Sequence, residues 1–263
     1  MKVRKYIYCL IILSVIEIGI IVSFDAIKSS KDSESIKATA QSKYANPVAT
    51  EEVAIFKSFN TEEEAIVPLS DSVTEDYFKD ALFVGDSRMK SLERMWKSKE
   101  GIFFCNEGIG VNNLLKKKIA VGNEGDLTFL EVLDNATYNK IYIQLGINDI
   151  AGCTMDGFLE KYKEIIDIIR ERQPHAIIYI QTIIYVESNL SETGQLYNNR
   201  NVESWNKGML DMAVDKGVYY MNINEVICDV DTNSLKDEYS SDGININEAA
   251  VMFIVDYIKS HVI

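Results

Sequence analysis

Short apolar segments of strand length alternate with helical patterns from Asp71 to the C-terminus. Five segments are predicted strands: Ala81–Val84, Ile102–Cys105, Lys140–Leu145, Ala176–Thr182 and Val218–Met221. Strands separated by helices form mainly parallel sheets, because each crossover helix packs on a face of the sheet. The sequence therefore predicts an α/β three-layer sandwich, in which helices enclose a five-stranded parallel sheet of flavodoxin-like order.

Three helices are predicted around these strands. One runs from Ser87 to Lys97, and a second, from Asp156 to Arg172, has its apolar side chains on one face. Asn247 is of a residue type that caps helices, and the last helix is predicted to follow it. In open parallel sheets, ligands bind beyond the carboxyl ends of the strands, so a site is expected in the loops at that edge.

Three polar motifs lie in such loops. Gly85–Ser87 follows the first predicted strand, Gly146–Asp149 follows the third, and Asp242–Asn245 precedes the last helix. A serine at the start of a helix exposes its hydroxyl beside backbone N–H groups that can stabilise an oxyanion. Serine is also a common helix cap, so the first motif alone leaves both interpretations open.

Asn148 and Gly108 favour the catalytic interpretation. A side-chain amide across a site can donate to the oxygen of a tetrahedral intermediate, and Asn148 follows the third strand. Gly108 follows the second strand and would offer a backbone N–H at close approach, because it has no side chain. The simpler alternative for the Gly146–Asp149 motif is a polar turn after a strand.

With these motifs, the chain resembles the SGNH (GDSL-type) hydrolases over roughly residues 74 to 263. The similar segments are Tyr77–Arg88, Ile141–Asn148 and Ser241–Asn247. The resemblance implies an esterase or acyl-transfer enzyme, and we expect no cofactor and no metal.

The resemblance also implies roles for individual residues. Ser87 matches the nucleophile and the first oxyanion donor, Gly108 the second donor (with Gly110 as an alternative) and Asn148 the third. Asp242 matches the acid that orients the catalytic histidine, but Asn245 occupies the position of that histidine.

Asn245 leaves two hypotheses open, because a serine hydroxyl is a weak nucleophile without a base and an amide is not basic near neutral pH. His175 and His261, the two histidines of the chain, are predicted to lie far from Ser87. The chain is either a serine ester hydrolase or acyl transferase acting on small acyl esters, with cell-envelope glycans as one substrate class, or a degenerate relative. The degenerate relative would bind a carbohydrate, an acylated ligand or a protein partner without turnover.

The N-terminus predicts a membrane anchor. Lys2, Arg4 and Lys5 precede an apolar run from Tyr6 to Phe24 that is long enough to span a bilayer. We expect residues 1–24 to anchor the chain in the cell membrane by a single span, residues 25–70 to form a polar spacer outside the cytoplasm, and residues 71–263 to form the hydrolase-like domain. A cleaved signal peptide is the alternative.

The composition limits the other function classes. A formal net charge of −13 argues against nucleic acid as the main partner, because phosphates require an excess of cations. No His/Cys cluster has metal-ligand spacing, and the glycines lack the spacing of a dinucleotide fingerprint. A Cys105–Cys153 disulfide is conceivable, and Tyr185 or Trp205 could line a sugar-binding groove. The oligomeric state is not indicated.

Overall fold

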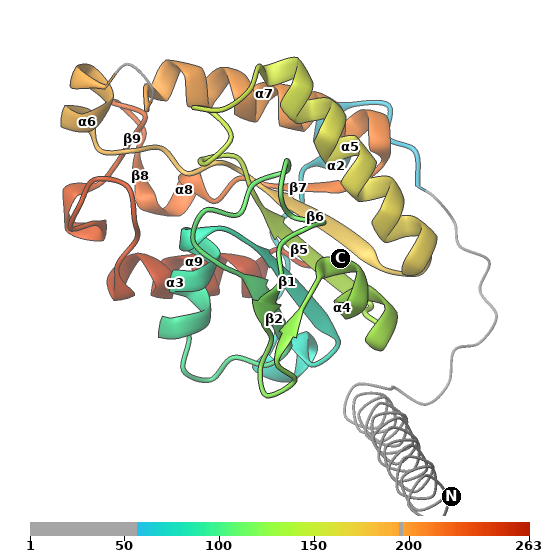
Figure 1. The fold of residues 1–263 in the computed structure, drawn as a ribbon. Helices are drawn as coiled ribbons and strands as arrows, with labels where there is room; N and C mark the ends of the chain where they lie inside the picture. The colour runs from blue at the N-terminus through green and yellow to red at the C-terminus, as the bar shows by residue number, and fades with distance from the viewer. Residues whose placement is uncertain (1–56, 195–196) are drawn as a thin grey trace, which may run out of the picture. The chain divides into compact units, whose positions relative to one another are not determined.

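The computed structural model describes residues 57–194 and 197–263 (Figure 1). The predicted anchor, residues 1–24, and the spacer up to residue 56 lie outside the described residues. Within the two described ranges, no helix has both the length and the apolar character needed to cross a membrane.

A five-stranded, fully parallel sheet is the centre of the fold (Figure 1). Its strands are β1 (Ala81–Gly85), β2 (Ile102–Cys105), β5 (Lys140–Gln144), β6 (Ile177–Gln181) and β7 (Tyr219–Met221). Their order is β2-β1-β5-β6-β7, which is the flavodoxin-like order. The structure confirms the predicted sheet, and each strand end falls within one residue of its predicted position.

Helices cover both faces of this sheet, as predicted for a three-layer sandwich (Figure 1). The helices α3 (Ser87–Met95) and α9 (Glu248–Ser260) pack against each other on one face, and α4 (Phe129–Asn135), α5 (Met155–Arg172) and α7 (Asn199–Lys216) lie on the other. Helices α4 and α7 were not predicted from the sequence. The buried apolar residues of α7 recur every three or four positions, at Val202, Trp205, Met209 and Met212.

Short elements complete the loops. They are α2 (Glu62–Ala65), the 3₁₀ helices η1 (Glu75–Phe78) and η2 (Asp237–Tyr239), α6 (Ser188–Thr193), α8 (Asn224–Ile227), and the two-stranded sheets of β3 (Ile119–Ala120) with β4 (Asp126–Leu127) and of β8 (Cys228–Asp229) with β9 (Ser234–Leu235).

An aromatic row crosses one face of the sheet. Phe83 stacks on Phe103 with ring centroids 4.6 Å apart and on Tyr142 at 4.8 Å. Tyr142 stacks in turn on Tyr179 at 4.6 Å, and Tyr179 lies 5.8 Å from Tyr219. Because these side chains come from five neighbouring strands, their contacts fix the relative positions of the strands and of the loops at their ends.

Residues 57–70 are packed on the domain, which corrects their prediction as part of a polar spacer. Phe59, Ala65 and Val67 are buried. The Val67 N–H donates to the Tyr220 carbonyl at 3.0 Å, so this segment pairs with the edge strand β7. The prediction was wrong here because glutamates surround the few apolar residues that the segment buries.

We expect Val67→Ala to lower the free energy of unfolding by about 2 kcal/mol, because it leaves a cavity at the sheet edge. Val67 is 2% exposed, whereas Leu69, two residues on, is 77% exposed. Leu69→Ala is therefore the matched control and should change stability by less than about 0.5 kcal/mol. Urea unfolding of both variants measures the difference, and equal stabilities would mean that the segment does not contribute to the fold.

Candidate active site

Ser87 stands at the carboxyl edge of the sheet because β1 ends at Gly85 and α3 begins at once. Asp86 caps α3, with its Oδ1 accepting the Arg88 N–H at 2.9 Å. Gly85 permits this close turn, since a Cβ there would lie 2.6 Å from the Gln144 carbonyl oxygen. Ser87 is thus the first residue of α3, half-buried, and faces a cavity of about 300 Å³.

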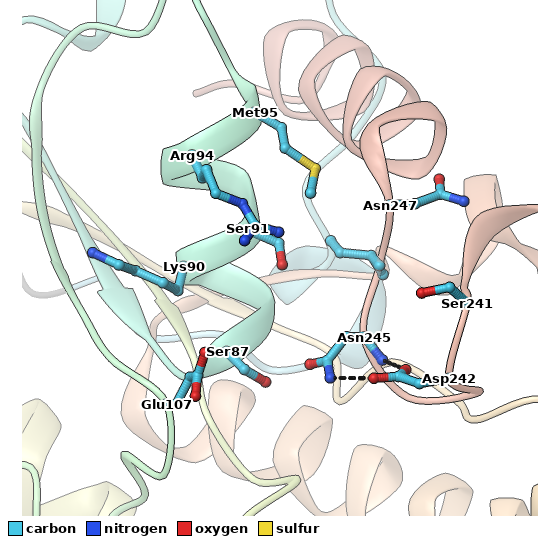
Figure 2. Close-up of a pocket in the computed structure, with 11 residues that line it drawn as sticks. Ser87, Lys90, Ser91, Arg94, Met95, Glu107, Ser241, Asp242, Asn245 and Asn247 are labelled. Atoms are coloured by element: carbon cyan, nitrogen blue, oxygen red, sulfur yellow. Dashed lines mark hydrogen bonds between the residues drawn. The ribbon is translucent and has the colours of Figure 1, made fainter.

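The cavity lies between α3 and the loop that precedes α9 (Figure 2). Ser87 lines it from α3, and Asp242 and Asn245 line it from the loop. The structure therefore brings together the three residues that the sequence placed at the catalytic positions, although Ser87 is more than 150 residues from the other two in the chain.

Asn245 and Asp242 form a closely bonded pair. The Asn245 backbone N–H donates to Asp242 Oδ1 at 2.7 Å, and its side-chain Nδ2 donates to Oδ2 at 2.7 Å. Burial opposes the charge on Asp242, but the bonds from Asn245 and Ile244 outweigh it and hold the pKa of this carboxyl below its usual value. The Asn245 amide thus donates to the carboxylate as a histidine N–H would.

The oxygen of the Asn245 amide is available to the site. Asn245 Oδ1 is buried and has no hydrogen-bond partner among the described residues. Figure 2 shows the amide between Asp242 and Ser87, with its oxygen on the Ser87 side. A buried acceptor without a partner is costly, so this oxygen is suited to accept a hydrogen bond from the Ser87 hydroxyl or from a ligand.

The predicted oxyanion donors Gly108 and Asn148 stand at the same sheet edge. Gly85 aligns with Cys105 of β2 and with Gln144 of β5, so the loops after these strands begin side by side. Neither Gly108 nor Asn148 lines the cavity between Ser87 and Asn245. They lie on the loops that follow β2 and β5.

The backbone of the loop after β2 distinguishes between the two glycines. Gly108 has φ +72°, which favours glycine, and none of the described residues accepts a hydrogen bond from its amide. The Gly110 amide, in contrast, donates to Asn113 Oδ1 at 3.1 Å. Asn148 Nδ2 donates to the Ile109 carbonyl at 2.7 Å and keeps a second N–H for the site. Gly108 is therefore better placed than Gly110 to bind an oxyanion.

Asp149 holds this loop in place. Its carboxylate is 4% exposed and accepts the Val111 N–H at 3.1 and 3.2 Å. Gly110 lets the carboxylate approach, because a Cβ there would lie 2.4 Å from Asp149 Oδ1. Burial, together with the charge of Asp86, raises the pKa of Asp149 to about 6. Asp149 belongs to a motif identified in the sequence, but this positioning role was not predicted.

The model of the GDSL-like lipase/acylhydrolase family matches residues 71–250 of this chain. The chain belongs to the GDSL-like lipase/acylhydrolase family. This confirms the resemblance to the SGNH (GDSL-type) hydrolases. A comparison with curated proteins gave no match.

Solved structures share the fold of this GDSL-family chain. A candidate platelet activating factor from Streptococcus pneumonia is 19% identical, with 92% of this chain and 97% of that chain covered and a TM-score of 0.56. A GDSL-like lipase from Bacteroides thetaiotaomicron is 12% identical, with 75% and 91% covered and a TM-score of 0.54. Identities this low support a common fold alone.

Neither histidine of the GDSL-family chain reaches the cavity. His175 is exposed in the turn before β6, at the opposite end of the sheet, and His261 follows the last residue of α9, where it stacks on Tyr257. Lys90 lines the cavity three residues after Ser87, but its ammonium pairs with Glu93 at 2.5 Å. That pairing raises the pKa of Lys90, so it is not a ready proton acceptor.

Buried polar groups support the region behind Ser87. Arg88 is 1% exposed and donates from Nη2 to the Ile184 carbonyl at 3.4 Å, in the segment after β6. Three buried asparagines of α7 and α8 each accept a backbone N–H through Oδ1 and donate to a backbone carbonyl through Nδ2 within residues 183–186: Asn199, Asn206 and Asn224. Burial lowers the pKa of Arg88 and raises that of Asp86. These hydrogen bonds fix residues 183–186, the segment that Arg88 contacts at the start of α3.

Three expectations about other residues are corrected by the structure. Cys105, Cys153 and Cys228 are all free, so the conceivable Cys105–Cys153 disulfide is absent. Trp205 is buried against Phe158 with ring centroids 4.7 Å apart, and it packs α7 on α5 instead of lining a sugar-binding groove. Tyr185 is half-buried and does not line the cavity beside Ser87.

Residues 57–194 and 197–263 contain no group of His, Cys, Asp and Glu side chains that could hold a metal ion. The residues that line the cavity from α3 beyond Ser87 were not predicted. Their helical spacing from Ser87 was the available signal.

Proposed function

We propose that this domain is a serine ester hydrolase or acyl transferase that acts on small acyl esters, with cell-envelope glycans as one substrate class. The observation that carries the proposal is the placement of Ser87 across one cavity from the hydrogen-bonded Asn245–Asp242 pair. Membership of the GDSL-like lipase/acylhydrolase family supports the same chemistry.

The reaction would follow the usual course of acyl transfer. Ser87 Oγ attacks the ester carbonyl carbon, and the carbonyl oxygen becomes an oxyanion that accepts from the N–H groups of Ser87, Gly108 and Asn148. The ester C–O bond then breaks, the alcohol leaves with a proton, and the acyl group remains on Ser87. Water or an acceptor hydroxyl attacks this acyl-enzyme to complete hydrolysis or transfer.

Asn245 makes this reaction slow. It can orient the Ser87 hydroxyl through Oδ1, but it cannot take the serine proton. Loss of a triad member typically costs about four to six orders of magnitude, which leaves roughly a thousandfold over water from binding and oxyanion stabilisation. Glu107, whose carboxylate lines the cavity beside Ser87 (Figure 2), is the acceptor that we propose for that proton.

A binding role without turnover is the second candidate, because Asn245 replaces the imidazole while keeping its bond to Asp242. The site would then hold an acylated or carbohydrate ligand, or a protein partner. In both cases we propose that residues 1–24 anchor the chain in the cell membrane by one span and that the domain lies outside the cytoplasm. The basic residues before the apolar run support this orientation.

We expect slow hydrolysis of 4-nitrophenyl acetate by the full chain that disappears in Ser87→Ala, with an acetyl group on Ser87 detectable by mass spectrometry. Ser87→Ala removes only one oxygen from a half-buried side chain, so we expect the variant to fold like the wild type. Equal circular dichroism spectra of the two proteins are the control. Equal rates in wild type and Ser87→Ala would contradict the hydrolase proposal. Ligand binding that Ser87→Ala leaves unchanged, without acylation, would support the binding role.

A further inference from the structure

The cavity beside Ser87 has different charges at its two ends. Ser87, Ser91 and Arg94 are four and three residues apart on α3, which places them on one face of the helix, and all three line the cavity. Glu107 and Asp242 lie at the Ser87 end, whereas Arg94 lies further along α3 (Figure 2). A bound molecule therefore meets carboxylates at one end of the cavity and a guanidinium at the other.

Arg94 is a cation without a partner in the described part of the chain. Its side chain is exposed, and none of the ion pairs or hydrogen bonds within residues 57–194 and 197–263 includes it. Lys90, the other cation of this wall, is already paired with Glu93. A guanidinium presents its N–H donors in a planar fork that matches a carboxylate or a phosphate. Arg94 is thus free to bind an anionic group.

The position of Arg94 sets how far this anionic group would lie from the ester. Seven residues separate Ser87 from Arg94, which is about 10 Å along the helix axis. Long helical side chains lean back toward the N-terminus, which brings the guanidinium nearer to Ser87. The guanidinium lies on the Ser91 side of the helix (Figure 2). This separation suits an ester and an anionic group on opposite sides of one ring.

The cavity is also on the side of the leaving alcohol. In serine hydrolases, the group at the position of Asn245 protonates the leaving group, so the alcohol part of the ester points toward that residue. Ser91, Ser241 and Asn247 line the space between and offer hydroxyl and amide groups to a hydroxylated ring. A chain with a net charge of −13 repels anions at longer range, so binding of an anionic alcohol here would depend on a local cation.

We infer that Arg94 is a specificity-determining residue, which selects acyl esters whose alcohol part carries a carboxylate or a phosphate about one ring away from the ester. This inference rests on the proposed function of the site. It narrows the substrate class from small acyl esters in general to esters of anionic alcohols, such as acidic or phosphorylated sugars.

The test compares matched acetyl esters on the full chain. The substrates are 4-acetoxybenzoate, its neutral methyl ester and 4-acetoxyphenyl phosphate, assayed with wild type, Arg94→Gln and Arg94→Lys. Lys161→Gln is the control for net charge, because Lys161 is exposed on α5 and does not line the cavity. The readout is the ratio of kcat/KM for an anionic ester to that for the neutral ester, so that differences in intrinsic ester reactivity cancel between variants.

We expect Arg94→Gln to lower this ratio about fivefold, Arg94→Lys to retain most of it, and Lys161→Gln to leave it unchanged. Raising the NaCl concentration from about 0.05 M to 0.5 M should weaken the preference in the wild type and not in Arg94→Gln. The anionic ester with the larger loss identifies carboxylate or phosphate as the preferred group. An unchanged ratio in Arg94→Gln would overturn the inference while the hydrolase proposal stands.

If the wild type hydrolyses none of the esters, the hydrolase proposal fails. The inference about Arg94 is then tested separately by measuring ligand binding. Calorimetric titration would compare 4-hydroxybenzoate with its methyl ester on wild type and Arg94→Gln. Tighter binding of the anion that is lost in Arg94→Gln supports Arg94 as the selecting residue. No preference for the anion in the wild type overturns it.

Discussion

We expect Asn245→His to raise kcat/KM for a small activated acetyl ester about a hundredfold or more above the wild type, because a positioned general base contributes roughly 10²–10⁴-fold. Asn245 Nδ2 already donates to Asp242 at 2.7 Å, so an imidazole can place its Nδ1–H on the same carboxylate. Its second nitrogen then faces Ser87, where the amide oxygen now lies without a partner. The cavity of about 300 Å³ beside Asn245 gives the larger ring room.

The pH profile and a double variant separate base catalysis from a general structural effect. The rate of Asn245→His should rise with pH through the imidazole pKa, which is near 6.5 in isolation and is raised by the neighbouring Asp242 carboxylate. Ser87→Ala in the Asn245→His background should remove the gain. A variant that folds normally and is no faster than the wild type would mean that the chain has lost more of the site than its proton acceptor.

The sheet could be predicted from the sequence because parallel strands buried on both faces are short apolar runs bounded by polar loops. The segment at residues 57–70 could not, because it buries only Phe59, Ala65 and Val67 among polar neighbours. Its pairing partner, β7, is more than 150 residues away in the chain, and no local pattern specifies that contact. Edge segments of this kind are defined by tertiary contacts.

Part of the candidate site could likewise be predicted from local sequence motifs, and part depends on tertiary packing. The convergence of Ser87, Asp242 and Asn245 was implied by the family resemblance and agrees with the rule that ligands bind at the carboxyl edge of a parallel sheet. Arg94 was not predicted, because its role depends on which face of α3 turns toward the loop before α9. That orientation is set by the packing of α3 on α9.

The clearest pH effect should come from Asp149, whose pKa of about 6 in the folded chain lies above the ordinary 3.8 of an unfolded aspartate. Between these values the folded state holds a proton that the unfolded state has released. The stability that the protonated Asp149 carboxyl contributes to the folded state is therefore fully present below about pH 3.8 and is lost as the pH rises through about 6. A pKa difference of this size corresponds to about 3 kcal/mol.

We expect Asp149→Asn to abolish this pH-dependent loss, because an amide does not ionise, while its oxygen can still accept the Val111 N–H. Urea unfolding at several values from about pH 4 to pH 7 would show the wild type losing about 3 kcal/mol relative to Asp149→Asn. Asp126→Asn, at an exposed position of β4, is the matched control and should follow the wild type within about 0.5 kcal/mol. A constant stability difference across this range would mean that Asp149 is ionised throughout. The loop that carries Gly108 would then be held by a carboxylate that stays charged across this pH range.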